Sequence, residues 1–384
     1  MSYRPEFKKV YPLYKIDDVI HMGSRHNFVE IPDEDGSIYD LLKLMDGTRT
    51  VDEIKQKIIE KYPHVTSEEV DEAIAEIDRL GFISDASALE RTQLTEKERD
   101  RFKGNLNFFS FFANSRQSNF EIQEKLNNST VTIIGMGGFG TNILYNMAGL
   151  GVKNVRIADF DRVELSNLNR QLLFNEKDIG RPKIEVAKEF MADFHSDMKI
   201  ETTLMKVESS KQVEELAAGS DLVLLAADEP MIKLAQWVNK ACVKLNIPYI
   251  VGGMGIDSGE FYSIIPGQSG CVDCMHLYFL KTNENYEAAT RQLLDFRPPN
   301  WGTAPGVAII TAMISLEATK ILTGVGPLVA NGKMYSINVH TLESEILHEW
   351  ERYEEECPTC GAGKHEYASF FDLFKEKVTG GHPS

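Results

Sequence analysis

The N-terminal part of the chain combines short apolar runs with amphipathic segments. Apolar runs at residues 8–14 and 28–31 predict two strands, separated by a turn-rich segment around Gly23. Apolar positions then recur at helical spacing, and Thr66 and Glu69 have the spacing of a capping box. The expected helices cover residues 37–45, 50–62 and 67–80, and a short closing strand is expected at 81–83. This pattern predicts a winged-helix-like α+β domain over residues 1–90.

The later part of the chain alternates between strand-like apolar runs and helix-like segments. Strands are expected at 131–134, 155–158, 200–206 and 222–227; helices are expected at 120–127 and 211–218 and in segments ending at Leu150 and Phe194. Strands alternating with helices are typical of an α/β fold with a mostly parallel sheet. We assign this domain to residues 120–361.

The remaining segments are assigned from composition. The stretch from 85 to 103 is charged and poor in apolar residues, which indicates a linker. We therefore assign residues 91–119 to a linker and lead-in segment, and residues 362–384 to a C-terminal tail.

Overall composition narrows the class of protein. The 384 residues are 42% hydrophobic, enough for a full core, and carry a formal net charge of -17. That charge argues against a general nucleic-acid binder, because no basic field would attract phosphate backbones. The sequence contains no run of about eighteen apolar residues, which a membrane span would need, and its N-terminus lacks an apolar signal core. We expect a soluble, cytoplasmic protein that binds neither nucleic acid nor membrane.

A Rossmann-like nucleotide-binding unit is predicted between residues 131 and 159. The first strand runs into a glycine turn, a helix-like segment follows, and the second strand ends on Asp159. In such units the glycines let the backbone approach phosphate, and the acid meets ribose hydroxyls. The glycines of the turn are Gly135, Gly137, Gly138 and Gly140. A glycine pattern alone is a weak signal.

A polar stretch after Asp159 strengthens the nucleotide prediction. Its candidate ligands are Asp161, Asn167, Arg170 and Gln171, followed by Lys183 after Gly180-Arg181-Pro182. A dehydrogenase has no evident use for an amide, a guanidinium and an ammonium grouped here. An enzyme that holds a triphosphate does, because these groups donate hydrogen bonds to phosphate oxygens and offset their charge.

Asp228 is the candidate magnesium ligand. It follows the apolar run 222–227, and an acid at the carboxyl end of a parallel strand lies at the edge where ligands bind. The structural alternative is that Asp228 caps the helix that begins near Pro230.

The cysteines predict a second metal site. Two Cys-x-x-Cys pairs are present, Cys271 with Cys274 and Cys357 with Cys360. Together they can complete a closed four-thiolate zinc site, which stabilises a fold rather than catalysing a reaction. A redox dithiol or two disulfides are the alternatives, and both fit poorly with a reducing compartment. Cys242 lies in an amphipathic segment and is expected to be a core residue.

Residues from about 110 to 361 resemble the adenylating domain shared by ThiF, MoeB and the ubiquitin-activating enzymes. Within that family the chain resembles the peptide-maturing enzymes that make microcin C and pantocin A. This second likeness rests on residues 237–242, 266–271 and 304–308 and on the small N-terminal domain. The resemblance implies ATP as cofactor and a homodimer. It places Asp159 on the ribose, Asn167, Arg170, Gln171 and Lys183 on the nucleotide and its phosphates, and Asp228 on Mg²⁺.

Two departures from the family pattern matter. The segment from Lys281 to Pro305 contains no cysteine, so a thioester step after adenylation is not expected. The family's Arg-x-x-Arg motif is reduced here to Ala113 and Arg116. Arg116 is therefore a candidate phosphate ligand supplied to the neighbouring subunit, with a solvated arginine as the alternative.

The function expected from these features is ATP-dependent adenylation of a carboxylate in a ribosomally made precursor peptide. The N-terminal domain is expected to hold the leader part of that peptide along a sheet edge, the alternative being a packing or dimerisation domain. DNA binding is disfavoured there because the helix at 67–80 is strongly acidic. Two other functions stay open, activation of a ubiquitin-like sulfur carrier and a non-catalytic adaptor that delivers a peptide.

Overall fold

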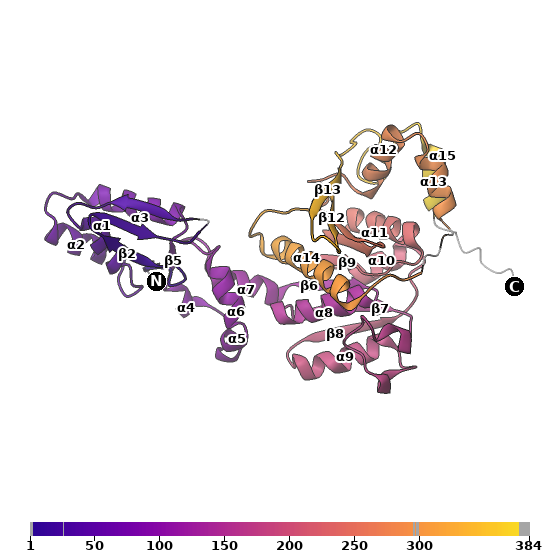
Figure 1. Cartoon of the computed structure of the whole chain (residues 1–384), viewed down its shortest axis with the longest axis horizontal. Coiled ribbons are helices and arrows are strands. Elements are labelled where there is room, and N and C mark those ends of the chain that lie inside the picture. Colours follow the sequence, from indigo (N-terminus) through magenta and orange to yellow (C-terminus); the bar gives the residue numbers. More distant parts are fainter. Residues whose placement is uncertain (1–2, 26, 295, 297–298, 376–384) are drawn as a thin grey trace. The chain divides into compact units, whose positions relative to one another are not determined.

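The computed structural model describes residues 3–25, 27–294, 296 and 299–375 of the 384-residue chain. The chain forms two compact units, Met1–Lys125 and Leu126–Ser384 (Figure 1). Each unit has a hydrophobic core of its own.

The first unit packs helices against small antiparallel sheets. Its strands are β1 (Pro5–Phe7), β2 (Leu13–Ile16), β3 (Val19–Met22), β4 (Val29–Pro32) and β5 (Ile83–Asp85), and its first helices are α1 (Ser37–Leu44), α2 (Val51–Lys61) and α3 (Ser67–Arg79). In one sheet β3 lies between β2 and β4, and in the other β1 pairs with β5. Thr50 and Thr66 begin α2 and α3 with capping boxes. The predicted small α+β domain is confirmed.

The middle strand of the three-stranded sheet was not predicted. The apolar run at 8–14 suggested one strand, whereas the structure forms a hairpin of β2 and β3. Asp17, with a φ of 51°, stands in its two-residue turn. The neighbouring acids make this segment read as a loop, although Ile20 and Met22 are fully buried beyond it.

The segment expected to be a linker contains helices. They are α4 (Ala88–Arg91), α5 (Glu96–Arg101), α6 (Lys103–Ser110) and the beginning of α7 (Asn119–Asn128). Thr95 begins α5 with a capping box, and Leu94, Phe102 and Phe109 are buried. Widely spaced apolar residues anchor these helices even though charged residues dominate the composition.

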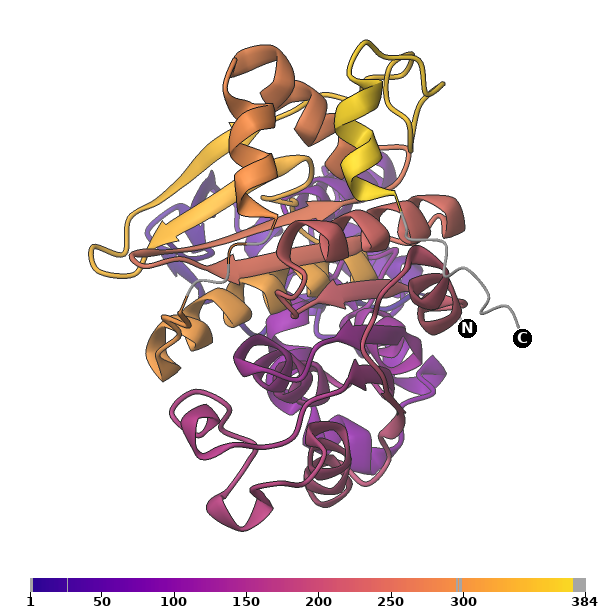
Figure 2. The ribbon, with the colours of Figure 1, turned by 90° about the vertical axis from the view of Figure 1, so that its right-hand side faces the viewer.

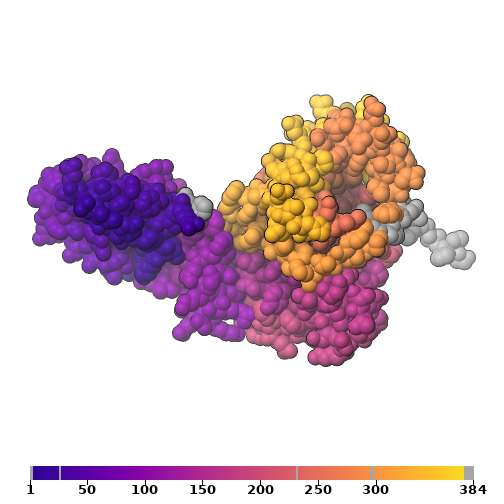
Figure 3. All heavy atoms as spheres, in the orientation of Figure 1, coloured from indigo at the N-terminus to yellow at the C-terminus, as the bar shows by residue number. Residues whose placement is uncertain are grey.

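The second unit is built on an eight-stranded sheet. Its strands are β6 (Thr130–Ile134), β7 (Asn154–Asp159), β8 (Lys199–Leu204), β9 (Leu222–Leu225), β10 (Tyr249–Met254), β11 (Ser258–Ile264), β12 (Lys333–Asn338) and β13 (Ser344–Glu349). They lie in the order β13-β12-β11-β10-β9-β6-β7-β8. The pairings from β10 to β8 are parallel, and those from β10 to β13 are antiparallel. The edge strand β13 is exposed along most of its length (yellow in Figure 3).

Helices cover the sheet of the second unit (Figure 2). They are α8 (Gly138–Leu150), α9 (Lys183–Phe194), α10 (Ser210–Ala217), α11 (Met231–Leu245), α12 (Val272–Thr282), α13 (Tyr286–Leu293), α14 (Ala304–Thr323) and α15 (Ala368–Phe371). Helix α8 packs against α9 and α14, and α10 packs against α11. The predicted α/β fold with a mostly parallel sheet is confirmed, with an antiparallel extension at one end.

The strand order creates a switch point at β6. From β6 the chain passes through α8 to β7 on one side, and it later returns to β9 on the other side. Ligands of doubly wound sheets bind outside the carboxyl ends of the strands at such a point. The glycine turn after β6 and Asp228 after β9 both lie at this edge.

Helix α14 is apolar around most of its circumference. Within the described residues it is the helix that is long and apolar enough, by length and composition, to span a membrane. More than half of its most apolar stretch is buried, and it packs against α8, β10 and β11. This burial is typical of a core helix.

Part of the expected C-terminal tail folds onto the second unit. Phe370 of α15 and Phe374 lie against His276 of α12, with ring centroids 5.7 and 5.1 Å from the imidazole. Burial lowers the pKa of His276 to about 3, so the ring is neutral, and its Nδ1 lies 2.7 Å from the hydroxyl of Tyr286. The tail thus covers the beginning of α13.

Candidate active site and metal centre

The glycine turn joins the carboxyl ends of β6 and β9. Gly135 has a φ of 100°, and a Cβ added to it would lie 2.7 Å from the backbone nitrogen of Ala227. A Cβ added to Gly140 would lie 1.9 Å from the carbonyl oxygen of Gly135. Both positions therefore require glycine, and the turn leads into the N-terminus of α8, where backbone N–H groups can meet phosphate.

Asp159 ties the turn to the end of β7. Its buried carboxylate accepts hydrogen bonds from the backbone N–H of Met136 at 2.5 Å and of Asp161 at 2.6 Å. Each oxygen keeps a second lone pair for a ribose hydroxyl. Sequence reasoning assigned only the ribose role, so the part that Asp159 plays in fixing the turn is an addition.

Lys183 and Asp161 form an ion pair. Lys183 is the first residue of α9, and its ammonium lies 2.9 Å from the carboxylate of Asp161. The lysine side chain is 6% exposed and the aspartate side chain 47% exposed. The ammonium is therefore held in place while its partner stays hydrated, which leaves further N–H donors for an anion.

The segment between β7 and α9 carries the other predicted nucleotide ligands. Arg170 donates from Nη1 to the carbonyl of Ser166 and to Oδ1 of Asn169; within the described residues it pairs with no carboxylate. Gln171 is buried, and its Oε1 has no hydrogen-bond partner in the described part of the chain. Asn167 is buried and accepts a hydrogen bond from the backbone of Glu164. The guanidinium of Arg170 could donate to a phosphate, and the unsatisfied Oε1 of Gln171 could accept from an N–H of a nucleobase.

Asp228 lies exposed in the segment that follows β9, three residues after the strand ends at Leu225. In the described structure it has no hydrogen bond or ion pair, so its carboxylate is available to a cation. Helix α11 begins after Pro230 and shows no side-chain cap. The capping alternative for Asp228 is therefore wrong.

Arg116 belongs to the first unit. It is exposed in the turn between α6 and α7, and its backbone N–H donates to Asn114. Ala113, which replaces the first arginine of the family motif, is buried. The role of Arg116 in a neighbouring subunit stays a prediction.

Two asparagines near Arg170 were missed by sequence reasoning. Asn142 of α8 donates to the carbonyl of Gly138 at 2.8 Å and to that of Arg170 at 3.4 Å. Asn169 donates to the carbonyl of Gly302, 133 residues further along the chain, at 3.3 Å. No local signal announces the contact of Asn142 with Arg170 or that of Asn169 with Gly302, because both depend on the tertiary fold.

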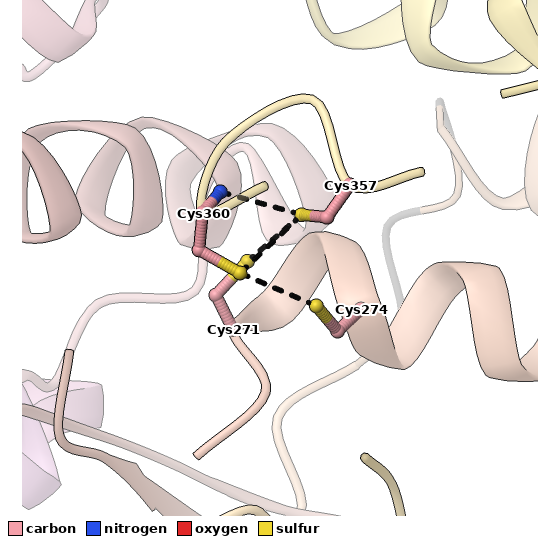
Figure 4. Close-up of side chains that lie close together, drawn as sticks. All are labelled: Cys271, Cys274, Cys357 and Cys360. Carbon is pink, nitrogen blue, oxygen red and sulfur yellow. Dashed lines mark hydrogen bonds between the residues drawn. The ribbon is translucent and has the colours of Figure 1, made fainter. Parts of the chain in front are cut away.

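The four cysteines of the Cys-x-x-Cys pairs meet at one point (Figure 4). Their sulfur atoms all lie within 4.8 Å of one another, and Cys271 and Cys357 are 3.5 Å apart. A tetrahedral zinc ion with Zn–S bonds of about 2.3 Å places its sulfurs roughly 3.8 Å apart. The cysteines are free, so the disulfide alternative is wrong. The donor set fits a structural zinc ion.

Backbone and thiol hydrogen bonds prepare these sulfurs for a cation. The N–H groups of Tyr353 and Cys360 donate to the sulfurs of Cys274 and Cys357, each at 3.4 Å. Hydrogen bonds from the Cys271 thiol lower the pKa values of Cys274 and Cys360, which favours the thiolate form at these two residues, whereas burial raises the pKa of Cys271 itself. Cys242 is different, because its burial raises its pKa, and its predicted core position is confirmed.

The fold and the site define an ATP-dependent adenylyltransferase. The ThiF family matches residues 102–359, and the chain belongs to this family. It is 30% identical over 240 residues to the sulfur carrier protein ThiS adenylyltransferase of Escherichia coli, covering 62% of this chain and 88% of that protein. It is 29% identical over 230 residues to the E. coli molybdopterin-synthase adenylyltransferase, covering 59% and 86% of the two chains.

Solved structures resemble the chain over a longer span. A crystal structure of E. coli MccB with AMPCPP and MccA matches with a TM-score of 0.71 at 20% identity, covering 93% of this chain and 99% of that one. An MccB structure with ATP matches equally, at 19% identity. PaaA matches with a TM-score of 0.67 at 23% identity, covering 90% and 100%. At these identities the likeness shows a shared fold.

Proposed function

We propose that this enzyme adenylates a carboxylate of a ribosomally made precursor peptide, as one step of a peptide modification. The observation that carries the proposal is the extent of the likeness. The sulfur-carrier enzyme covers 62% of the chain and the family match begins at residue 102, whereas the MccB fold covers 93%. The first unit thus lies mostly outside the ThiF match. It is included in the match to MccB, an enzyme crystallised with a peptide.

The proposed reaction is an in-line displacement on ATP. A carboxylate oxygen attacks the α-phosphorus, the bond to the bridging oxygen of the β-phosphate breaks, and pyrophosphate leaves with that electron pair. Lys183 and Arg170 would offset the charge that grows on the phosphates. Asp228 would hold Mg²⁺, which, when bound, neutralises phosphate charge. Because the product is an activated acyl group, no protein nucleophile is needed, in accord with the cysteine-free stretch from Lys281 to Pro305.

The free edge of β4 is the proposed site for the leader. β4 pairs with β3 alone among the described strands. Asp33 donates its N–H to the carbonyl of Asp18, and Ile31 lies opposite Ile20. Hydrogen-bonded pairs alternate along an antiparallel ladder, so the N–H and C=O of Glu30 point away from β3. An added strand could pair there through backbone groups while tolerating varied side chains.

Tethering explains how such an enzyme can act on a weakly bound end of the peptide. A leader held on the first unit raises the local concentration of the reactive carboxylate. The test of the clamp is Glu30→Pro, which removes the outward N–H without touching the ladder to β3. We expect a higher KM for precursor peptide and an unchanged KM for ATP. Glu30→Ala is the matched control, because it removes the side chain and keeps the N–H.

The proposed function is tested by ATP–pyrophosphate exchange. The intact enzyme should exchange label with precursor peptides encoded beside its gene and not with a ubiquitin-like sulfur carrier. The opposite result would support carrier activation, which the likeness to the ThiS and molybdopterin-synthase enzymes favours. The adaptor alternative is disfavoured by membership of an adenylyltransferase family.

We also propose a homodimer. The exposed positions of α14 are all apolar. Most of them are four residues apart, so they form a stripe on one side of the helix. They are Pro305, Ala308, Ala312 and Leu316. Tyr145 of the adjoining α8 is also exposed. A second copy would remove this apolar surface from water, and Leu316→Glu should then yield monomers in sedimentation velocity.

The dimer proposal includes Arg116 acting on the neighbouring subunit. Mixing inactive Arg116→Ala and Asp228→Ala chains should restore about a quarter of the sites, if subunits exchange freely in a two-fold dimer. Only sites that combine an intact Asp228 with an intact Arg116 from the other chain would work. No recovery in exchanged mixtures would count against the role of Arg116.

We place the enzyme in the cytoplasm, where thiols stay reduced and bind zinc.

A further inference from the structure

The side chain of Arg170 lies between two glycines from distant parts of the second unit. A Cβ added to Gly138, at the start of α8, would lie 3.3 Å from Cγ of Arg170. A Cβ added to Gly302, just before α14, would lie 2.9 Å from Cδ of Arg170. The aliphatic part of the arginine is thus in close contact with the nucleotide turn on one side and with the segment before α14 on the other.

Asn169 also connects Arg170 to Gly302, through hydrogen bonds to both residues. Its Oδ1 accepts from Nη1 of Arg170 at 2.8 Å, and its Nδ2 donates to the carbonyl of Gly302 at 3.3 Å. The N–H of Gly302 in turn donates to Oδ1 of Asn300 at 2.8 Å. A side-chain amide is suited to this place because it offers an acceptor and a donor at once.

We propose that Asn169 and Gly302 are positioning residues that set the guanidinium of Arg170 and couple it to the segment 300–303. The inference rests on the proposed role of Arg170 in binding the phosphates of ATP. It adds that a displacement of Gly302 displaces Arg170, since packing and hydrogen bonds join them. By linkage, whatever orders this segment strengthens ATP binding, and ATP binding orders the segment.

The position of Gly302 makes the coupling testable with a single methyl group. Its backbone is outside the left-handed region, so alanine introduces no backbone strain. The methyl group would meet Arg170 Cδ, Asn300 Oδ1 at 3.0 Å and Val307 Cγ2 at 3.3 Å. Gly253 in β10 is a matched control, because a Cβ there has no atom within 4 Å and its backbone is equally unstrained.

The experiment is a double-mutant cycle on the full-length enzyme. The dissociation constant of a non-hydrolysable ATP analogue and the KM and kcat of pyrophosphate exchange are measured for Gly302→Ala in two backgrounds, wild type and Arg170→Ala. In the wild type we expect roughly tenfold weaker binding, which lies within the usual range of coupling between two sites. In Arg170→Ala the same substitution should change binding less than about twofold, because its target is gone. Gly253→Ala should bind normally, and Asn169→Ala should repeat the non-additive pattern.

Three results would overturn the coupling. Normal ATP binding by Gly302→Ala would show that Arg170 does not depend on this glycine. An equal loss in both backgrounds would show a general structural effect that bypasses Arg170. If Arg170→Ala alone bound ATP normally, the phosphate role of Arg170 would fail and the coupling with it. The second result leaves that phosphate role standing, so the two failures are distinguishable.

Discussion

Lys183 and Asp161 are joined twice. The ammonium of Lys183 lies 2.9 Å from the carboxylate of Asp161, and the backbone N–H of Lys183 donates to the carbonyl of Asp161 at 3.0 Å. The first turn of α9 is therefore fixed to the loop that follows β7, and the lysine stands in place before any nucleotide arrives. Charged groups that need no reorganisation during reaction are the most effective at stabilising a transition state.

Replacing Lys183 with alanine should lower the rate of pyrophosphate exchange by about a hundredfold or more, because one preorganised cation is lost. Stability should change little, since the aspartate that remains is half exposed and stays hydrated. The measurements are exchange kinetics and thermal unfolding. Lys188→Ala on the exposed side of α9 is the control and should keep full activity. Full activity in Lys183→Ala would remove this lysine from the site.

Replacing Asp228 with alanine should abolish AMP formation and leave thermal stability unchanged. The side chain is exposed, and it has no hydrogen bond or ion pair among the described residues, so the fold does not depend on it. Activity of Asp228→Glu should require a higher Mg²⁺ concentration than the wild type, because the longer side chain displaces the carboxylate. The neighbouring Glu229→Ala is the control. A magnesium dependence unchanged in Asp228→Glu and activity kept in Asp228→Ala would contradict the assignment.

The elements that sequence reasoning predicted are those with strong local patterns. The turn around Gly135 is readable because a buried strand precedes it and a helix-compatible segment follows. The paired cysteines are readable because metal spacing is local, although only the fold brings Cys271 to within 3.5 Å of Cys357. Local pattern failed at β3, where a strand of four residues next to an acidic turn reads as a loop.

The parts that could not be predicted depend on contacts between distant segments. Asn169 meets Gly302 across 133 residues, and neither residue stands out in its own segment. The helices around Phe102 were hidden by the charged residues beside it, because a few buried side chains suffice to anchor a short helix. Residue types therefore nominated the candidate phosphate ligands, and tertiary structure was needed to find what positions them.

Cys357→Ser should lower both zinc content and stability. The purified enzyme is expected to contain about one zinc ion per chain, and the variant much less. Loss of a structural metal removes its binding free energy from folding, so the melting temperature should fall by roughly 10 °C. Zinc is measured by elemental analysis and unfolding by calorimetry. Cys242→Ser is the control, because it replaces a buried thiol outside the cluster and should keep its zinc. A metal-free wild type of full stability would rule out the zinc site.

The stability of the first unit should depend on pH through Lys8. This lysine is 3% exposed, and its ammonium donates to the carbonyl of Phe111 at 3.3 Å. Burial lowers the pKa of Lys8 from 10.5 to about 8, and the charge of Asp78 offsets part of that effect. Below pH 8 the folded state must bury a charge that the unfolded chain exposes to water, which costs stability.

Raising the pH should relieve that cost. Between pH 8 and 10.5 the folded lysine loses its proton while the unfolded lysine keeps it, so the unfolding free energy rises with pH. From pH 8 to 9.5 we expect a gain of roughly 1.5 kcal/mol. Burial raises the pKa of Tyr3, so that folded tyrosine stays neutral in this range. Urea unfolding at the two pH values measures the gain, and Lys8→Met should abolish it while being the more stable protein at pH 8. Equal pH dependence in wild type and Lys8→Met would show that another group is responsible.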